Sequence, residues 1–285
     1  MLNANATSAA NFRRTLLQLL LLVAAPWAMV PAAADTHVPN TAFQSGETLQ
    51  YDLYYNWKFV WVKAGSASMS ISSTTYQGRP AFRTRLLTRG SSQADKFFVL
   101  RDTLTSVVTA EDMLPRTYSK TDMEGDSYRQ RHVWFSYPSE SGSHARQQYI
   151  NPKGAVSWKE EGSEETIYDM LSIMLQARSF DATGFQKGHK IEFTMTDGSG
   201  MSKQTLIYRG KKDLKMKNGD ATYRCLVLSF VEYENGKEKE VVTFYVTDDL
   251  NHIPVRLDMY LRIGAAKAYL VGAKGVRNPM AAKLK

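Results

Sequence analysis

Two carboxylates in this chain are candidates for an acid and base pair. Asp102 follows the end of an apolar stretch and Arg101, and Asp169 lies beside the apolar stripe of an expected helix. Two carboxylates about 5–10 Å apart in a cleft can hydrolyse a glycosidic bond. Buried charges are usually paired, so Arg101 is expected to bind one of them and fix the helix to the sheet. We therefore take a polysaccharide hydrolase as the alternative and not as the leading hypothesis.

Arginines recur with strand spacing. Arg83, Arg85 and Arg89 share one side of an expected strand, and Arg129 and Arg131 share one side of another. Together with Arg101, Arg83 and Arg85 are candidate ligands for anionic sugars or lipid headgroups, because a guanidinium group binds carboxylates and phosphates with two hydrogen bonds. The alternative is a solvated outer face whose charge is balanced across the strands.

Aromatic side chains gather near the beginning of the chain. Trp57, Phe59 and Trp61 lie on one side of an expected strand. Such a stripe can stack on sugar rings or line a cavity for an acyl chain, so these three residues are candidate ligand-binding residues. The alternative is that they belong to the core of the barrel.

Sequence motifs of known chemistry are missing. The chain has no G-x-S-x-G, H-E-x-x-H, phosphate-binding glycine loop or C-x-x-C. Its histidines do not follow metal-ligand spacing, so we expect no metal site and no cofactor. These histidines are His37, His132, His144, His189 and His252.

The elements that position these residues are strands. Alternating apolar and polar residues fill 46–150 and 188–276, and Ile167, Met170, Leu171 and Met174 give an apolar helical stripe within about 164–179. Three segments of the first part have counterparts in the second. They are Gly46–Tyr51 with Gly188–Phe193, Gly78–Arg83 with Gly219–Arg224, and Asp112–Pro115 with Asn251–Pro254.

The resulting fold class is all-β and mainly antiparallel. We expect a single barrel or strongly curved sheet over 46–276, built from two repeated halves with one helix at their junction. Residues 35–45 are predicted to be a flexible lead-in and 277–285 a tail.

The N-terminus is typical of a signal peptide. Arg13 and Arg14 precede an apolar run, and Ala32–Ala34 offers small residues for cleavage near Ala34, so residues 1–34 are expected to be removed. What remains has 34 basic against 28 acidic residues, a mild excess that does not demand a nucleic-acid partner. A second apolar stretch long enough to span a membrane is missing. The lone Cys225 excludes an internal disulfide.

Several short motifs resemble a family of exported bacterial proteins catalogued as a domain of unknown function. They are Gly46-Glu47 with Leu49-Gln50-Tyr51, Lys63-Ala64-Gly65, Phe97–Asp102, Leu114-Pro115, Tyr168–Ser172 and Asp249–Val255. The resemblance implies a mostly antiparallel barrel of two half-barrels, similar in shape to periplasmic carriers that hold lipid or lipoprotein. It implies no activity.

From these observations we expect a periplasmic or secreted protein of the bacterial envelope. The leading hypothesis is non-catalytic binding of an apolar or amphipathic ligand, such as a lipid or glycan, or of an envelope protein. A purely structural assembly role is a further alternative, which a large exposed apolar patch would favour.

Overall fold

The computed structural model describes residues 39–57, 60–95, 99–125, 127–138, 142–217, 221–234, 236–261 and 264–284. The predicted signal peptide and residues 35–38 of the lead-in lie outside these ranges. The elements in chain order are β1 Thr48–Trp57, β2 Val60–Tyr76, β3 Arg79–Gly90, α2 Ser92–Asp95, β4 Leu100–Thr109, β5 Pro115–Glu124, β6 Ser127–Ser136, β7 Ser143–Ile150, β8 Val156–Ser163, β9 Ile167–Tyr168, α3 Met170–Arg178, β10 Lys190–Thr196, β11 Met201–Lys215, β12 Thr222–Glu234, β13 Lys237–Thr247, β14 Pro254–Tyr260 and β15 Ala265–Lys274.

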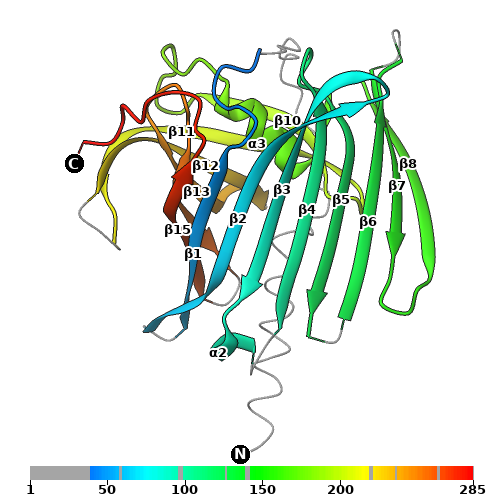
Figure 1. Cartoon of the computed structure of the whole chain (residues 1–285), viewed down its shortest axis with the longest axis horizontal. Coiled ribbons are helices and arrows are strands. Elements are labelled where there is room, and N and C mark those ends of the chain that lie inside the picture. The colour runs from blue at the N-terminus through cyan, green and yellow to red at the C-terminus, as the bar shows by residue number, and fades with distance from the viewer. Residues whose placement is uncertain are drawn as a thin grey trace, which may run out of the picture.

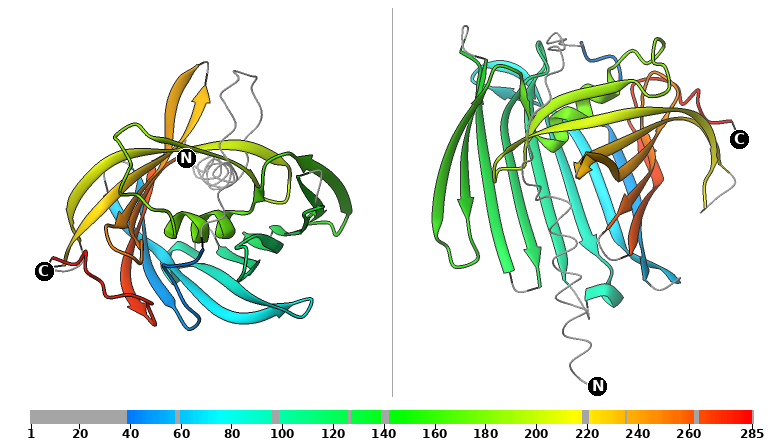
Figure 2. Two further views of the ribbon diagram at one scale, coloured as in Figure 1. Left: turned by 90° about the horizontal axis from the view of Figure 1, so that it is seen from above. Right: turned by 180° about the vertical axis from the view of Figure 1, so that it is seen from behind.

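The strands of the described residues form one sheet that curls around α3 (Figures 1 and 2). Its order is β8-β7-β6-β5-β4-β3-β2-β1-β15-β14-β13-β12-β11-β10-β9, so each strand from β1 to β8 lies beside its neighbour in sequence, and β1 pairs with β15. The paired strands run antiparallel except for β9, which runs parallel to β10. The predicted all-β, mainly antiparallel fold, a barrel or strongly curved sheet, is confirmed, and the observed sheet is a nearly closed barrel.

Alternation decides which side of each strand faces the interior. On β4, Leu104, Ser106 and Val108 are buried and face the core, and on the paired β3 the same side carries Thr84 and Leu86. The opposite side of β3 carries Arg83 and Arg85, which are exposed. Successive strand residues point to opposite faces, so a sheet with one buried face reads as this alternation.

Two loops of the sheet share local geometry. Met113 and His252 both have positive φ, 56° and 44°, and each is followed by an apolar residue and a proline. Thr109 N donates to Leu114 O at 3.1 Å, and Thr247 N donates to Ile253 O at 2.9 Å. These matching turns agree with the predicted duplication of two halves, which stays a prediction.

The barrel closes without a backbone ladder between β8 and β9. Ser143 Oγ donates to Glu165 O and accepts from Ile167 N at 3.0 Å. Thr196 Oγ1 donates to Gln147 Oε1 at 2.7 Å, and Met201 N donates to Glu161 Oε2 at 3.1 Å. We call this line of contacts between β7–β8 and β9–β11 the seam. Side chains hold it together.

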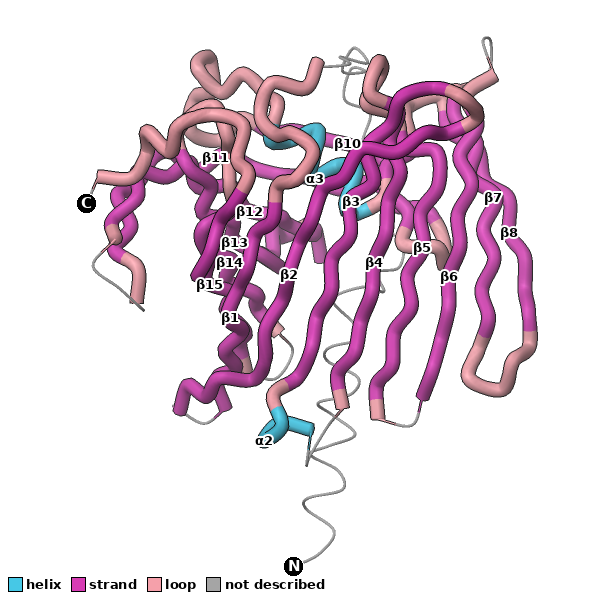
Figure 3. The backbone as a smooth tube through the Cα atoms, in the orientation of Figure 1, coloured by secondary structure: helices cyan, strands magenta, loops and turns pink. Residues whose placement is uncertain are grey.

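The helix is shorter than the pattern over 164–179 suggests. α3 spans Met170–Arg178, because Ile167–Tyr168 is extended and pairs with β10. Its N-cap is Asp169, and Ser163, which is also a residue type favoured at N-caps, ends β8. Figure 3 shows α3 enclosed by strands. In the described ranges, no helix is both long and apolar enough to cross a membrane.

Candidate functional site

The helix α3 is fixed to the sheet at its N-terminal end by Asp169. One carboxylate oxygen accepts from Leu171 N at 2.8 Å and Ser172 N at 3.0 Å, and the other accepts from Ser106 Oγ of β4 at 2.7 Å. Ser172 Oγ in turn accepts from Asp169 N at 2.9 Å, which completes a capping box. Burial raises the pKa of Asp169 to about 6, although these hydrogen bonds oppose the shift.

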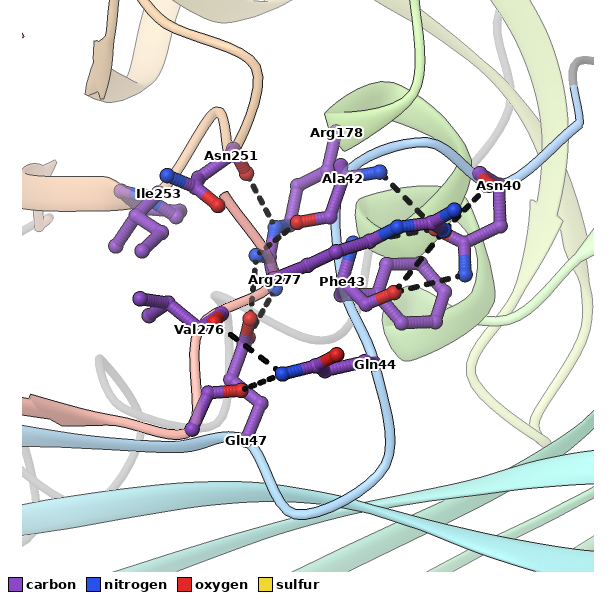
Figure 4. A network of polar contacts seen from close by, with 12 residues as sticks. Asn40, Ala42, Phe43, Gln44, Glu47, Arg178, Asn251, Ile253, Val276 and Arg277 are labelled. Atoms are coloured by element: carbon purple, nitrogen blue, oxygen red, sulfur yellow. Dashed lines mark hydrogen bonds and ion pairs between the residues drawn. The ribbon is translucent and has the colours of Figure 1, made fainter. Parts of the chain in front are cut away.

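The C-terminal end of α3 is fixed by a buried ion pair. Arg178, the last residue of α3, donates from Nη2 to Glu47 Oε2 at 2.9 Å and from Nε to Asn251 O at 3.0 Å (Figure 4). Glu47 has no exposed surface and Arg178 is 2 % exposed. His252 Nδ1 donates to the Arg178 carbonyl at 2.7 Å. The helix is therefore connected to β4 at its N-terminal end, and to the segment before β1 and the β13–β14 loop at its C-terminal end.

One face of α3 remains open toward the inside of the sheet. Leu171, Ile173 and Leu175 are buried, whereas Met170 and Met174 are only half-buried. These two methionines are four residues apart, which places them on one side of the helix. Met174 packs against clusters from both halves of the sheet.

The inner face of β12–β14 continues this apolar surface. Its side chains point toward α3 but remain half-buried. They are Leu228, Phe230, Phe244, Leu257 and Met259, and we call them the apolar inner face. In a filled barrel such inward-facing residues would be fully buried by their neighbours. Their remaining exposure shows that part of this concave surface is accessible.

A small cleft of about 20 Å³ lies at the edge of this surface. It separates the end of α3 and the loop that follows from the inner sides of β10–β13. Most lining side chains are apolar, among them Phe180, Phe185 and Ile191, and Tyr208 and His252 add polar groups. Its apolar lining with few polar groups is typical of sites for small apolar or amphipathic ligands, but the cleft itself has room for only about one water molecule.

The opposite wall carries charge instead. Lys120 and Asp122 of β5 and Arg131 of β6 face inward and are no more than 3 % exposed. Asp122 accepts from Arg129 Nε at 2.5 Å and from Arg131 Nη1 at 2.8 Å, and Lys120 Nζ lies 3.9 Å from its Oδ1. Burial, followed by the charge of Arg131, lowers the pKa of Lys120. We call these four residues the buried charge cluster.

The two carboxylates proposed as an acid and base pair are not brought together at one cleft. Asp169 contacts Ser106 of β4. Asp102 lies on β4 four residues before Ser106, which is about 13 Å along the strand at the usual rise per residue. The cross-strand neighbour of Asp102 is Asp122, within the buried charge cluster. Asp169 has no exposed surface. Its contacts are those of a helix cap.

Arg101 pairs with Asp95 of α2 and with neither of these carboxylates. Its Nη1 donates to Asp95 Oδ1 at 2.9 Å, and its side chain is 38 % exposed. Arg83 and Arg85 lie on the outer face of β3, away from the apolar inner face. The structure therefore does not gather the three predicted arginines around the interior.

The predicted aromatic stripe is only partly described. Phe59 and the side chain of Trp57 lie outside the described part of the chain. Trp61 shares a side of β2 with Lys63, and its ring lies 4.6 Å from Lys267 Nζ. Because Lys63 pairs with Asp52 on the outer side of β1, Trp61 also belongs to the outer surface.

The apolar inner face was not singled out by the sequence, although its signal was present. Leu228 and Phe230 alternate with Ser229, and Leu257 and Met259 alternate with Asp258. This is the ordinary pattern of a core strand, and it does not reveal which inward side chains keep some exposure.

Metal binding and thiol chemistry find no support in the site. Among the described residues, no group of three His, Cys, Asp or Glu side chains is arranged to hold a metal ion. Cys225 is fully buried, and burial raises the pKa of its thiol to about 12. A thiol in this environment is a poor nucleophile.

Solved structures resemble this fold at very low sequence identity. A β-barrel-like protein of the domain of unknown function DUF1849 from Brucella abortus matches with a TM-score of 0.50 and 9% identity, over 83% of this chain and 100% of its own. A Bacteroides fragilis protein described as exported, with a YmcC-like fold, matches with a TM-score of 0.34 and 7% identity, over 83% and 99%. No curated protein matches the chain.

The sequence itself gives the family. A family model described as "Protein of unknown function (DUF3108)" matches residues 50–271, which covers the sheet from β1 to β15. The chain therefore belongs to this family of unknown function.

Proposed function

We propose that this protein binds an apolar or amphipathic ligand on the inner side of its curled sheet. The observation that carries the proposal is the half-buried state of Leu228, Phe230, Phe244, Leu257 and Met259, which point inward beneath α3. Apolar surface left open in a concave site gains about 25 cal/mol for each Å² that a ligand covers. The half-buried face of α3 adds flexible methionine side chains to the same surface.

Polar groups near the cleft support an amphipathic ligand over a purely apolar one. Tyr208 and His252 line the cleft together with Phe180 and Ile191. A ligand with an apolar body and a polar end would satisfy both kinds of lining. The described side chains around the cleft include no nucleophile beside a base and no acid and base pair, and the role we propose is therefore binding.

The proposed compartment is the bacterial periplasm or the cell exterior. The predicted signal peptide, with cleavage near Ala34, supports export. N-terminal sequencing of the protein recovered from a periplasmic fraction tests this point, and a mature chain beginning at Asp35 is the expected result.

Binding is tested with the protein expressed from residue 35 and a fluorescent fatty acid as probe. Leu228→Asp places a charge on the apolar inner face, and we expect probe affinity to fall by roughly tenfold or more. Leu250→Asp is the matched control, since Leu250 is 66% exposed in a loop and its replacement should leave affinity unchanged. Circular dichroism checks that both variants fold, and Leu228→Ala serves if the aspartate variant does not.

Equal affinity in Leu228→Asp and Leu250→Asp would contradict the proposed site. Native mass spectrometry of the protein purified gently from its own envelope then identifies the natural ligand class. A lipid-sized mass that disappears on denaturation is the expected result.

A further inference from the structure

Three arginines on the outer face of β3 lack the partners that other arginines have. Arg83, Arg85 and Arg89 are exposed, and within the described residues no carboxylate or carbonyl contact is found for their side chains. The remaining described arginines either form an ion pair with a carboxylate or, for Arg277, donate to backbone carbonyls. The charge of β3 is therefore unusual for this molecule, because it is left uncompensated.

Hydroxyl side chains lie across from each of these arginines on the neighbouring strand β2. On β2, Ser72, Ser70 and Ser66 lie directly across from Arg83, Arg85 and Arg89. On the other side, Thr105 of β4 lies across from Arg85. Serine and threonine hydroxyls both donate and accept hydrogen bonds, so this surface offers cations and hydroxyls to the same partner.

The register of the sheet extends this surface toward its free edge. Successive cross-strand neighbours connect Arg85 to Trp158 in a single row across β3–β8. The row consists of Arg85, Thr105, Ser119, His132, Gln148 and Trp158. Adjacent strands lie about 4.8 Å apart, so the row offers a regularly repeated set of polar groups to a linear molecule that crosses the strands.

An exposed aromatic group ends the row. Trp134 and Trp158 are 40% and 50% exposed, and their rings stack with centroids 5.7 Å apart. His132 stacks on Trp134 at 6.0 Å, and the Arg146 guanidinium lies 4.5 Å from the Trp158 ring centroid. Large aromatic rings held in place but open to solvent are suited to contact with the apolar faces of another ring system.

We propose that the outer face of β3–β8 binds an anionic glycan. Guanidinium groups recognise carboxylates or phosphates on the polymer, hydroxyls bind sugar hydroxyls, and tryptophan rings stack on sugar rings. Charge complementarity carries the choice of partner, because no acidic side chain in the described part of the chain pairs with the three arginines. The serines opposite them are short and polar, which fits a hydrated polymer better than the acyl region of a membrane. This surface is separate from the apolar inner face and does not depend on ligand binding there.

The test uses polygalacturonate as the anionic glycan and dextran as the neutral one, with binding to the protein expressed from residue 35 measured by calorimetry at low salt. We expect polygalacturonate to bind and dextran to bind far more weakly. The triple variant R83Q/R85Q/R89Q should lose roughly tenfold or more in affinity. The control K212Q/K215Q/K237Q removes the same charge from exposed positions of β11 and β13 and should change affinity little.

A second variant separates a glycan from a simple polyanion. Trp158→Ala should lower the affinity for polygalacturonate several-fold. It should leave the affinity for inorganic polyphosphate unchanged, because polyphosphate has no sugar rings. The proposal is overturned if polygalacturonate does not bind, if both triple variants lose affinity equally, or if Trp158→Ala has no effect. Binding to vesicles of anionic lipid that depends on the same arginines, without polygalacturonate binding, would also overturn it. All substituted side chains are exposed, so folding should be preserved.

Discussion

The two inner walls of the sheet carry different kinds of side chain. The wall formed by β12–β14 presents Leu228, Phe230 and Phe244, which are apolar and half-buried. The wall formed by β5 and β6 presents Lys120, Asp122 and Arg131, which are charged and almost completely buried. If hydrophobic burial alone determined the arrangement, the charged side chains would be exposed and the apolar ones fully buried, because charges are costly to remove from water.

The location of the buried charge cluster accounts for this inversion. The cluster lies beside the seam, where a Cβ added at Gly198 would come within 2.8 Å of Arg131 Cβ, so the turn after β10 packs directly on Arg131. Gln147 of β7 and Glu161 of β8, the strands that follow this wall, bond to Thr196 and Met201 across the seam. The polar wall thus closes the barrel, and the apolar wall keeps the accessible surface proposed for a ligand.

The most damaging change should be the removal of the carboxylate that the cluster shares. Asp122→Asn leaves Lys120, Arg129 and Arg131 without their common partner, and we expect the free energy of unfolding to fall by about 3–5 kcal/mol. Urea unfolding followed by circular dichroism measures the loss. The control is Glu160→Gln, which breaks an exposed pair with Arg146 and should cost less than about 1 kcal/mol. Similar losses in both variants would show that the cluster does not stabilise the closed barrel.

A matched pair of leucines tests the contrast in packing between the two walls. Leu104 faces inward on β4 and is 3% exposed, whereas Leu228 is half-buried on β12. Leu104→Ala should cost about 2–5 kcal/mol of unfolding free energy, since it leaves a cavity. Leu228→Ala should cost about 1 kcal/mol, because part of its side chain is already in contact with water.

Binding should respond in the opposite order. Leu228→Ala should weaken binding of the fluorescent fatty acid. Leu104→Ala should bind this probe about as tightly as the original protein does, when affinity is measured well below the unfolding transition. If the two leucines had equal effects on stability, the apolar wall would be as tightly packed as the rest of the core, and the proposed site would lose its basis.

Alternation in the sequence was sufficient to predict the sheet, its antiparallel order and the helix at the junction. Helix capping was harder, because both Ser163 and Asp169 are good N-cap residues. Pairing of Ile167–Tyr168 with β10 decided between them, and that is a long-range contact. Local sequence carries no information about such a contact.

The candidate site was less predictable than the fold. Lys120, Asp122 and Arg131 share strand sides in a way that looks like a solvated face, yet they are buried by a turn that lies far away in sequence. Arg83 and Arg85 have the same pattern and are exposed. Which side of a charged strand faces inward depends on the curvature of the sheet and on what covers it.

The smallest effect expected is a change in the pH dependence of stability that originates from Asp169. Burial raises its pKa from 3.8 to about 6, so the folded protein holds this proton more tightly than the unfolded chain does. Stability from this group therefore increases as the pH falls from 7 to 5, by about 1 kcal/mol, and the gain is complete only when the pH lies well below 3.8, the ordinary pKa of the group.

Asp169→Asn should remove this gain, because an amide does not titrate while asparagine remains a good N-cap. The quantity to measure is the difference in unfolding free energy between the two proteins at pH 7 and at pH 5, which cancels the titration of every other group. We expect the unfolding free energy of the original protein to rise by about 1 kcal/mol relative to that of the variant between pH 7 and pH 5. A difference that stays constant would mean that the hydrogen bonds from Ser106, Leu171 and Ser172 compensate fully for the burial of the charge. In that case the helix would be attached to β4 at no electrostatic cost.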